Sequence, residues 1–157
     1  METESHMVVF EAFAGALLFV HLVTAVVALG SAVHLAVRLW RGAGSAVVRL
    51  HGTLTTAAFT ACYLTGCLIY PTFRVRVRAE LFDGTLPWAT GLFEAKEHLA
   101  TLGLVAVVSL ALMLRQRPRS GRPWRGRQLA AGLLALVLAV LAFNAWTGWF
   151  LTSLRSI

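Results

Sequence analysis

Four histidines lie within segments that are otherwise strongly apolar. His21 and His34 share the stretch FVHLVTAVVALGSAVHLAV, which carries no formal charge, and His51 and His98 lie near the starts of two later apolar stretches. An imidazole is costly to place in hydrocarbon without a partner, so a histidine in such a segment indicates a ligand, a hydrogen bond or a functional role. Imidazole nitrogen also ligates many metals, haem iron among them. The spacing of these four side chains therefore decides what chemistry they can share.

Four apolar runs define the helices that must position the histidines. The runs cover residues of about 8–37, 46–70, 91–114 and 129–151, and each is close to or above the roughly 20 residues that a helix needs to cross a bilayer. The chain has 157 residues and is 13% charged, whereas a soluble domain is about one quarter charged. Residues 1–157 are thus predicted to form one all-α integral membrane domain, a four-helix transmembrane bundle with up-down-up-down topology.

Basic residues are distributed unevenly between the two ends of this predicted bundle. Nine arginines lie in or beside loops 38–45 and 115–128, against five basic residues on the other side. The positive-inside rule then places both loops in the cytoplasm and both termini outside. This placement explains the net charge of +7 without nucleic acid, and membrane lipids become the expected partners of the arginines.

The histidines match in depth as two pairs. His34 lies three residues before the end of its run and His51 about five residues after the start of the next, and a short glycine-containing turn makes these helices antiparallel neighbours. His21 and His98 each lie sixteen residues from the same side of the membrane, about 20 Å further along the helices. Two stacked sites with two histidines each are therefore predicted. Haem is the ligand that two facing imidazoles between apolar walls suit best.

Two other functions remain open from the residues alone. A metal-ion transporter or metal-binding membrane protein for copper, zinc or iron would use His21 and His98 with Glu94 and Glu97. The same two carboxylates could orient an axial imidazole or relay a proton, or they could simply begin a solvated helix. A non-catalytic anchor or assembly subunit would use all four histidines for packing only. The visible spectrum of the purified protein separates these alternatives.

Three further features accompany the histidines. Asn144 lies at the predicted level of His21 and could bond a haem propionate, a quinone or a ligating histidine, or join helices. After Pro71, which is predicted to end the second span, the stretch FRVRVRAELF forms either a short strand or an interfacial helix. The basic residues of this stretch are Arg74, Arg76 and Arg78. They could steer an anionic reactant, bind haem propionates or form a solvated run of charges.

The pattern resembles the four-helix, two-haem b-type cytochromes of bacterial membranes, such as superoxide oxidases and quinone-linked cytochromes. In that class one helix carries two histidines thirteen or fourteen residues apart, as His21 and His34 are here, and other helices supply their partners, here His51 and His98. The resemblance implies an oxidoreductase of the bacterial inner (plasma) membrane that carries electrons through two b haems, or one, between an outer small anionic or protein partner and a quinone pool. It also implies a homo-oligomer or a place in a larger respiratory complex.

Overall fold

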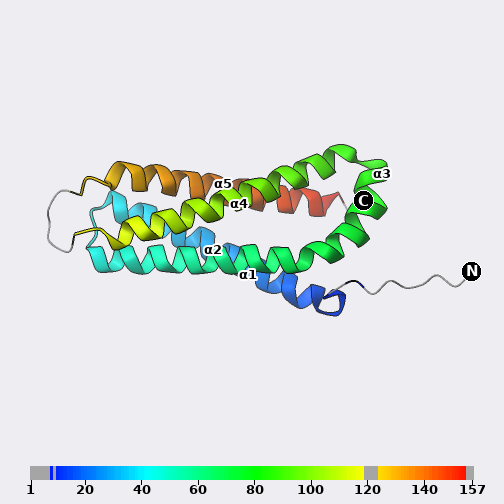
Figure 1. Ribbon diagram of the computed structural model, residues 1–157, viewed down its shortest axis with the longest axis horizontal. Coiled ribbons are helices and arrows are strands. Elements are labelled where there is room, and N and C mark those ends of the chain that lie inside the picture. Colours follow the sequence, from blue (N-terminus) through cyan, green and yellow to red (C-terminus); the bar gives the residue numbers. More distant parts are fainter. Residues whose placement is uncertain (1–7, 9, 119–123, 155–157) are drawn as a thin grey trace, which may run out of the picture.

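Four long helices make up most of the chain in the computed structural model, which describes residues 8, 10–118 and 124–154. The long helices are α1 (Ala14–Trp40), α2 (Ser45–Phe73), α4 (Pro87–Arg115) and α5 (Arg127–Ser153). Short helical segments adjoin them, namely η1 (Glu11–Phe13), η2 (Arg74–Phe82) and α3 (Asp83–Thr85). Figure 1 shows the long helices side by side as an elongated bundle. The prediction of an all-α four-helix bundle is confirmed.

All four long helices are long and apolar enough to cross a membrane. Large apolar side chains point outward along them, as Phe19 and Val26 do on α1 with 68% and 72% of their surface exposed. A water-soluble bundle would place polar side chains there, whereas hydrocarbon tails solvate apolar ones. The chain therefore has the architecture of an integral membrane protein.

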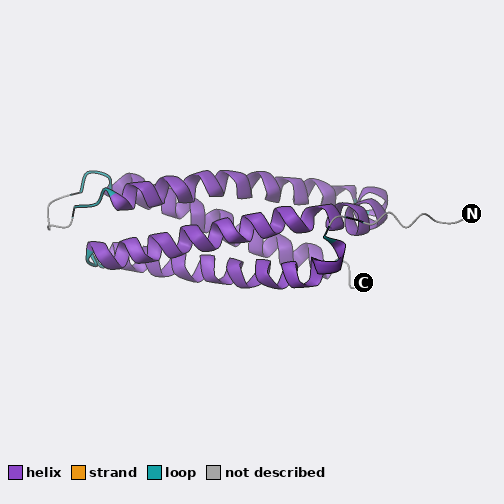
Figure 2. Cartoon of the chain, turned by 60° about the horizontal axis from the view of Figure 1, so that its bottom comes forward, coloured by secondary structure: helices purple, strands orange, loops and turns teal. Residues whose placement is uncertain are grey.

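Each long helix packs against two others, in the order α1, α2, α4, α5 and back to α1. Consecutive long helices run in opposite directions, which gives the predicted up-down-up-down path (Figure 2). The ring leaves α1 and α4 diagonally opposite each other. One end of the bundle, here called the arginine-rich end, carries residues 38–49, 115–118 and 124–127, and the opposite end carries η1, η2 and α3.

Buried apolar side chains form two separate clusters along the bundle. The larger cluster occupies the half near the arginine-rich end and includes Leu35, Val48, Leu110 and Val137, one from each long helix. The smaller cluster closes the opposite end, and its buried members are Val77, Phe82, Ala89, Phe93 and Leu151. Between the clusters the helices carry polar side chains, which become important for the functional site.

The second span does not end at Pro71, so that prediction is wrong. Helix α2 continues through Pro71 to Phe73, and η2 extends it as a π-helix to Phe82. Proline removes only its own backbone donor, and the wider π-helical pattern still bonds the turns that follow. Phe73 stacks on Phe93 with 4.0 Å between ring centroids, which holds the extension against α4. The strand alternative for this segment is therefore excluded, and the helical alternative is correct.

Gly103 sets the close approach of three helices and supports a test of the packing. A Cβ atom at Gly103 would lie 2.7 Å from Phe59 Cζ on α2 and 2.8 Å from Val140 Cγ1 on α5. Gly103→Ala should therefore destabilise the bundle by about 1–3 kcal/mol through overpacking. Gly132→Ala is the matched control because no atom lies within 4 Å of its Cβ position, and it should leave stability equal or slightly higher. Unfolding in detergent micelles measures both, and equal effects would contradict this packing.

Candidate functional site

Two imidazoles face each other across the seam between α1 and α2. The ring centroids of His34 and His51 lie 6.0 Å apart, and the ring planes differ by 23°. His34 is exposed and His51 is half-buried. The short turn at residues 41–44 joins the two helices and brings the rings to one depth, as predicted from the sequence.

The separation of these rings suits a shared metal ion. A bond between a metal and an imidazole nitrogen is about 2.0–2.1 Å long, and the ring centroid lies about 1 Å behind that nitrogen. Two imidazoles on opposite sides of one ion therefore have centroids about 6 Å apart. The observed 6.0 Å between His34 and His51 agrees with this value. Two nitrogens on opposite faces are also the ligand set of a bis-histidine haem.

Backbone carbonyls orient both rings for ligation. Nδ1 of His34 lies 2.8 Å from the carbonyl oxygen of Gly30, and Nδ1 of His51 lies 2.9 Å from that of Val47. A carbonyl oxygen only accepts hydrogen bonds, so Nδ1–H donates in each case. The neutral ring then carries its lone pair on Nε2, which is the arrangement that metal-ligating histidines have.

A buried polar bridge lies directly beside this pair and limits where a macrocycle can sit. The hydroxyl of Thr55 lies 3.1 Å from that of Ser31 across the seam, and it also lies 2.8 Å from the His51 carbonyl oxygen. The bridge fills the inner side of the seam, because Thr55 has no exposed surface. Space lies on the outer side, where Gly30 has no atom within 4 Å of its Cβ position. A group placed between the two rings would therefore find its room on the open, outer face of α1 and α2.

Apolar side chains flank the open face. They lie at helical spacing from His34 or His51, which puts them on the histidine side of the seam. They are the exposed side chains of Val27, Val47 and Leu54. Such side chains suit the faces of a porphyrin ring, which is apolar except at its propionates. The face thus offers an apolar surface next to two fixed nitrogen ligands.

His21 and His98 have other partners in the structure, so it does not bring the second predicted pair together. Nδ1 of His21 lies 2.8 Å from the carbonyl oxygen of Cys62 on α2, and the Cys62 Sγ atom is 3.6 Å from Nδ1. His98 is exposed on α4, with Nδ1 2.7 Å from the Glu94 carbonyl oxygen. Helices α1 and α4 lie diagonally opposite each other, and His98 shares the exposed face of Glu94 and Thr101. An equal depth in the membrane is therefore not sufficient to bring His98 close to His21.

Lys96 marks a polar layer between the two apolar clusters. It is half-buried on the core side of α4, and its Nζ atom lies 5.1 Å from the centroid of the Phe93 ring. Its charge acts through space on His21 and Cys62. Thr147 of α5 has no exposed surface, and its hydroxyl has no hydrogen-bond partner among the described residues. A cation at this depth in a membrane bundle is uncommon and indicates a functional or positioning role.

Asn144 and the two cysteines add little to a possible binding site. The Asn144 amide donates to the Val140 carbonyl oxygen at 2.9 Å, within its own helix. Cys62 and Cys67 are both free thiols. The described residues contain no group of three or more histidine, cysteine, aspartate or glutamate side chains that could hold a metal ion. Within the described part, a site built from protein ligands alone thus has at most two of these groups.

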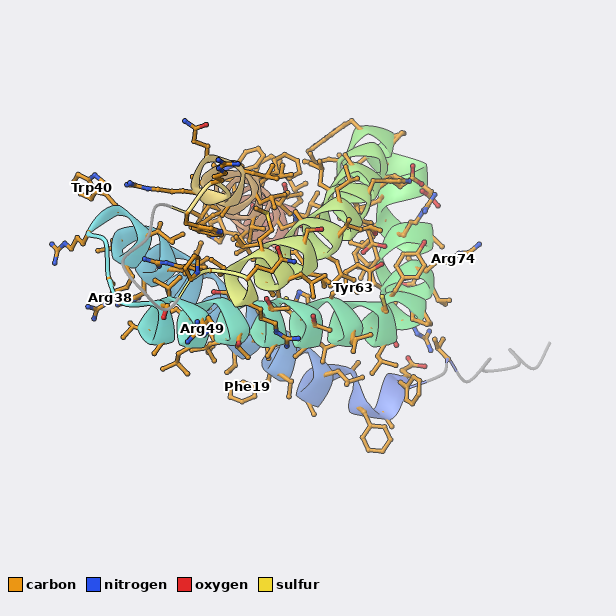
Figure 3. The ribbon with its side chains drawn as sticks, turned by 60° about the vertical axis from the view of Figure 1, so that its left-hand side comes forward. Phe19, Arg38, Trp40, Arg49, Tyr63 and Arg74 are labelled. Carbon is orange, nitrogen blue, oxygen red and sulfur yellow. The ribbon has the colours of Figure 1, made fainter. Side chains whose placement is uncertain are left out.

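The arginines of η2 lie at the end opposite the histidine pair, where Figure 3 labels Arg74. Arg76 Nε lies 2.8 Å from Glu11 Oε1, and Arg78 bridges Asp83 and Glu94 at 3.3 Å and 2.9 Å. These ion pairs join η1, η2 and α4 and compensate much of the positive charge. A steering field for anions is correspondingly weaker than three unpaired arginines would produce. Arg74 is exposed.

The chain matches no protein-family model, no curated protein and no solved structure. Its function therefore has to be argued from its own residues. Three of these were not among the predicted site residues, namely Ser31, Thr55 and Lys96, and the sequence suggested Ser31 and Thr55 only as small residues that leave room beside the histidines. Ser31 and Thr55 lie three residues before His34 and four after His51, and this spacing beside each histidine was the signal that could have found them.

Proposed function

We propose that this chain is a b-type membrane cytochrome that holds one haem between His34 and His51. The 6.0 Å separation of the two ring centroids supports the proposal most strongly, because it is close to the separation of two imidazoles bound on opposite sides of one metal ion. The two hydrogen bonds from Nδ1 to helix carbonyls support it independently, since they leave Nε2 of both rings available. Haem b supplies one-electron redox chemistry when bound.

The residues around the pair have defined tasks in this proposal. The carbonyls of Gly30 and Val47 hold the imidazole planes, and the Ser31–Thr55 bridge maintains the register of the two helices. The apolar open face admits a hydrophobic redox partner from the lipid, for which a quinone is the chemical class proposed. The excess of arginine at the nearby end favours the cytoplasmic side of the bacterial inner membrane for this site.

The proposal is for one haem, with electron exchange near the arginine-rich end. A second haem between His21 and His98, and with it electron transfer across the bilayer, would require His98 to turn from the exposed face of α4. That second site stays a prediction. No observation favours a metal-ion transporter, because the described residues gather no third ligand beside any pair.

The visible spectrum of the purified chain tests the proposal. We expect one haem b per chain by pyridine haemochrome assay, with the sharp reduced spectrum of bis-imidazole iron. Two haems per chain would mean that His21 and His98 also ligate. Protein that is folded and free of haem, expressed in cells supplied with haem, would contradict the proposal and leave an anchor or assembly role.

A further inference from the structure

A guanidinium without a carboxylate partner lies at the arginine-rich end. Arg117 follows the end of α4, and its Nη2 donates to the carbonyl oxygen of Ala43 at 2.8 Å. Its guanidinium carbon lies 6.0 Å from the centroid of the Trp124 ring. Arg117 thus joins the turn between α1 and α2 to the segment that precedes α5.

Trp124 is packed firmly enough to form one wall of a site. A Cβ atom at Gly126 would lie 2.9 Å from Trp124 Nε1 and 3.1 Å from Met113 Cε, so the indole ring occupies the space that this glycine leaves. Ala43, Met113 and Trp124 all pack against the larger apolar cluster. The ring and the turn therefore hold the Arg117 side chain in one position.

The charge of Arg117 has no carboxylate partner among the residues that the structure describes. Its Nη1 atom is buried and has no hydrogen-bond partner among the described residues. Residues 38–49 and 115–127 contain nine arginines and no aspartate or glutamate. A buried guanidinium donor without an acceptor is costly, and a cation without a counter-ion adds to that cost. An acceptor for Arg117 therefore has to come from outside this end of the chain.

We propose that Arg117 binds a phosphate-bearing anion beside the turn at residues 41–44. A guanidinium presents parallel N–H donors that match two phosphate oxygens, and Nη1 of Arg117 has no acceptor among the described residues. Helix α2 begins at Ser45, two residues after Ala43, with no side-chain cap, so its first turn directs free N–H groups to the same region. The remaining arginines at this end add a field of the same sign.

An anionic lipid headgroup is one source of that phosphate, and a free phosphate group is the other. Trp40 is 80% exposed at this end, where Figure 3 also labels Arg38. Exposed tryptophan with arginine is typical of the headgroup level of a membrane. Both sources offer the same phosphate oxygens to Arg117, so the experiment has to distinguish them.

Thermal unfolding of the delipidated full chain in a neutral detergent tests the site. The additions are phosphatidylglycerol, phosphatidylcholine and inorganic phosphate, and native mass spectrometry counts retained lipid. We expect phosphatidylglycerol to raise the Tm and to remain bound at about one molecule per chain, and phosphatidylcholine to have little effect. Stabilisation by inorganic phosphate alone would identify free phosphate as the source and would equally support the proposal.

Matched variants separate this site from general attraction to the arginines. Arg117→Gln should weaken binding of the stabilising anion about tenfold or more, because it removes charge-assisted bonds. Arg125→Gln removes the same charge from an exposed position of the same loop and should behave almost as the wild type. Arg117→Lys keeps the positive charge without the paired N–H donors of a guanidinium and should bind with intermediate affinity. This variant replaces Arg117→Gln in the comparison if the glutamine variant does not fold. Equal responses of the residue 117 and residue 125 variants, or no response of the wild type to any phosphate, would overturn the proposal.

Discussion

Replacing either His34 or His51 with alanine should remove all haem from the purified protein. In the proposed site each ring would supply one ligand to the haem iron, and the ring centroids are 6.0 Å apart on different helices. Haem held by a single imidazole on an open face, with no enclosing pocket, would be lost during purification. The Soret and reduced α bands of both variants should therefore fall to background, while the protein band on a gel is unchanged.

His98→Ala is the matched control for these variants. Nδ1 of His98 is bonded to the carbonyl four residues before it, just as in His34 and His51, but the ring is exposed on α4. Its removal should leave the spectrum intact. Free imidazole added to His51→Gly should restore part of the haem if the loss is a loss of ligation rather than of folding. Full haem in the His34 variant, or loss in the His98 variant alone, would show that the ligands are wrong.

The fold could be predicted from the sequence because hydrocarbon imposes a simple requirement. Four apolar runs of sufficient length leave few alternatives to four helices, and the structure has them. Their ends were less predictable. The first apolar run begins at about residue 8, whereas α1 begins at Ala14. Helix α1 also continues past the end of the run to Trp40, because tryptophan and arginine are favoured at the membrane interface.

The candidate site was predictable only where the chain itself limits the geometry. Four residues join α1 to α2, so the depths of His34 and His51 had to match and their helices had to be neighbours. A long connection through η2 and α3 leads to α4 instead, and depth then says nothing about which face a histidine occupies. Lys96, not His98, lies on the core side of α4. Phe93, three residues before Lys96, and Gly103, seven residues after it, are both buried and indicate that face.

Cysteines placed at the two ends of the bundle should react on opposite sides of the membrane. Gly84→Cys, exposed in α3, should be labelled by an impermeant maleimide in intact cells. Gln116→Cys, exposed after α4, should be labelled only after permeabilisation. The reason is the excess of arginine in residues 38–49 and 115–127, nine against five basic residues elsewhere, which favours retention of that end in the cytoplasm. The effect should be close to all-or-none for each position.

The wild-type chain is the blank for this labelling, because its cysteines, Cys62 and Cys67, lie within α2 between the two ends. Ser120 lies near the middle of loop 115–128 but outside the described residues, so Gln116 is the position chosen for the cysteine. Labelling of Gln116→Cys in intact cells with protection of Gly84→Cys would invert the topology. The histidine pair and Arg117 would then lie on the outer side of the membrane.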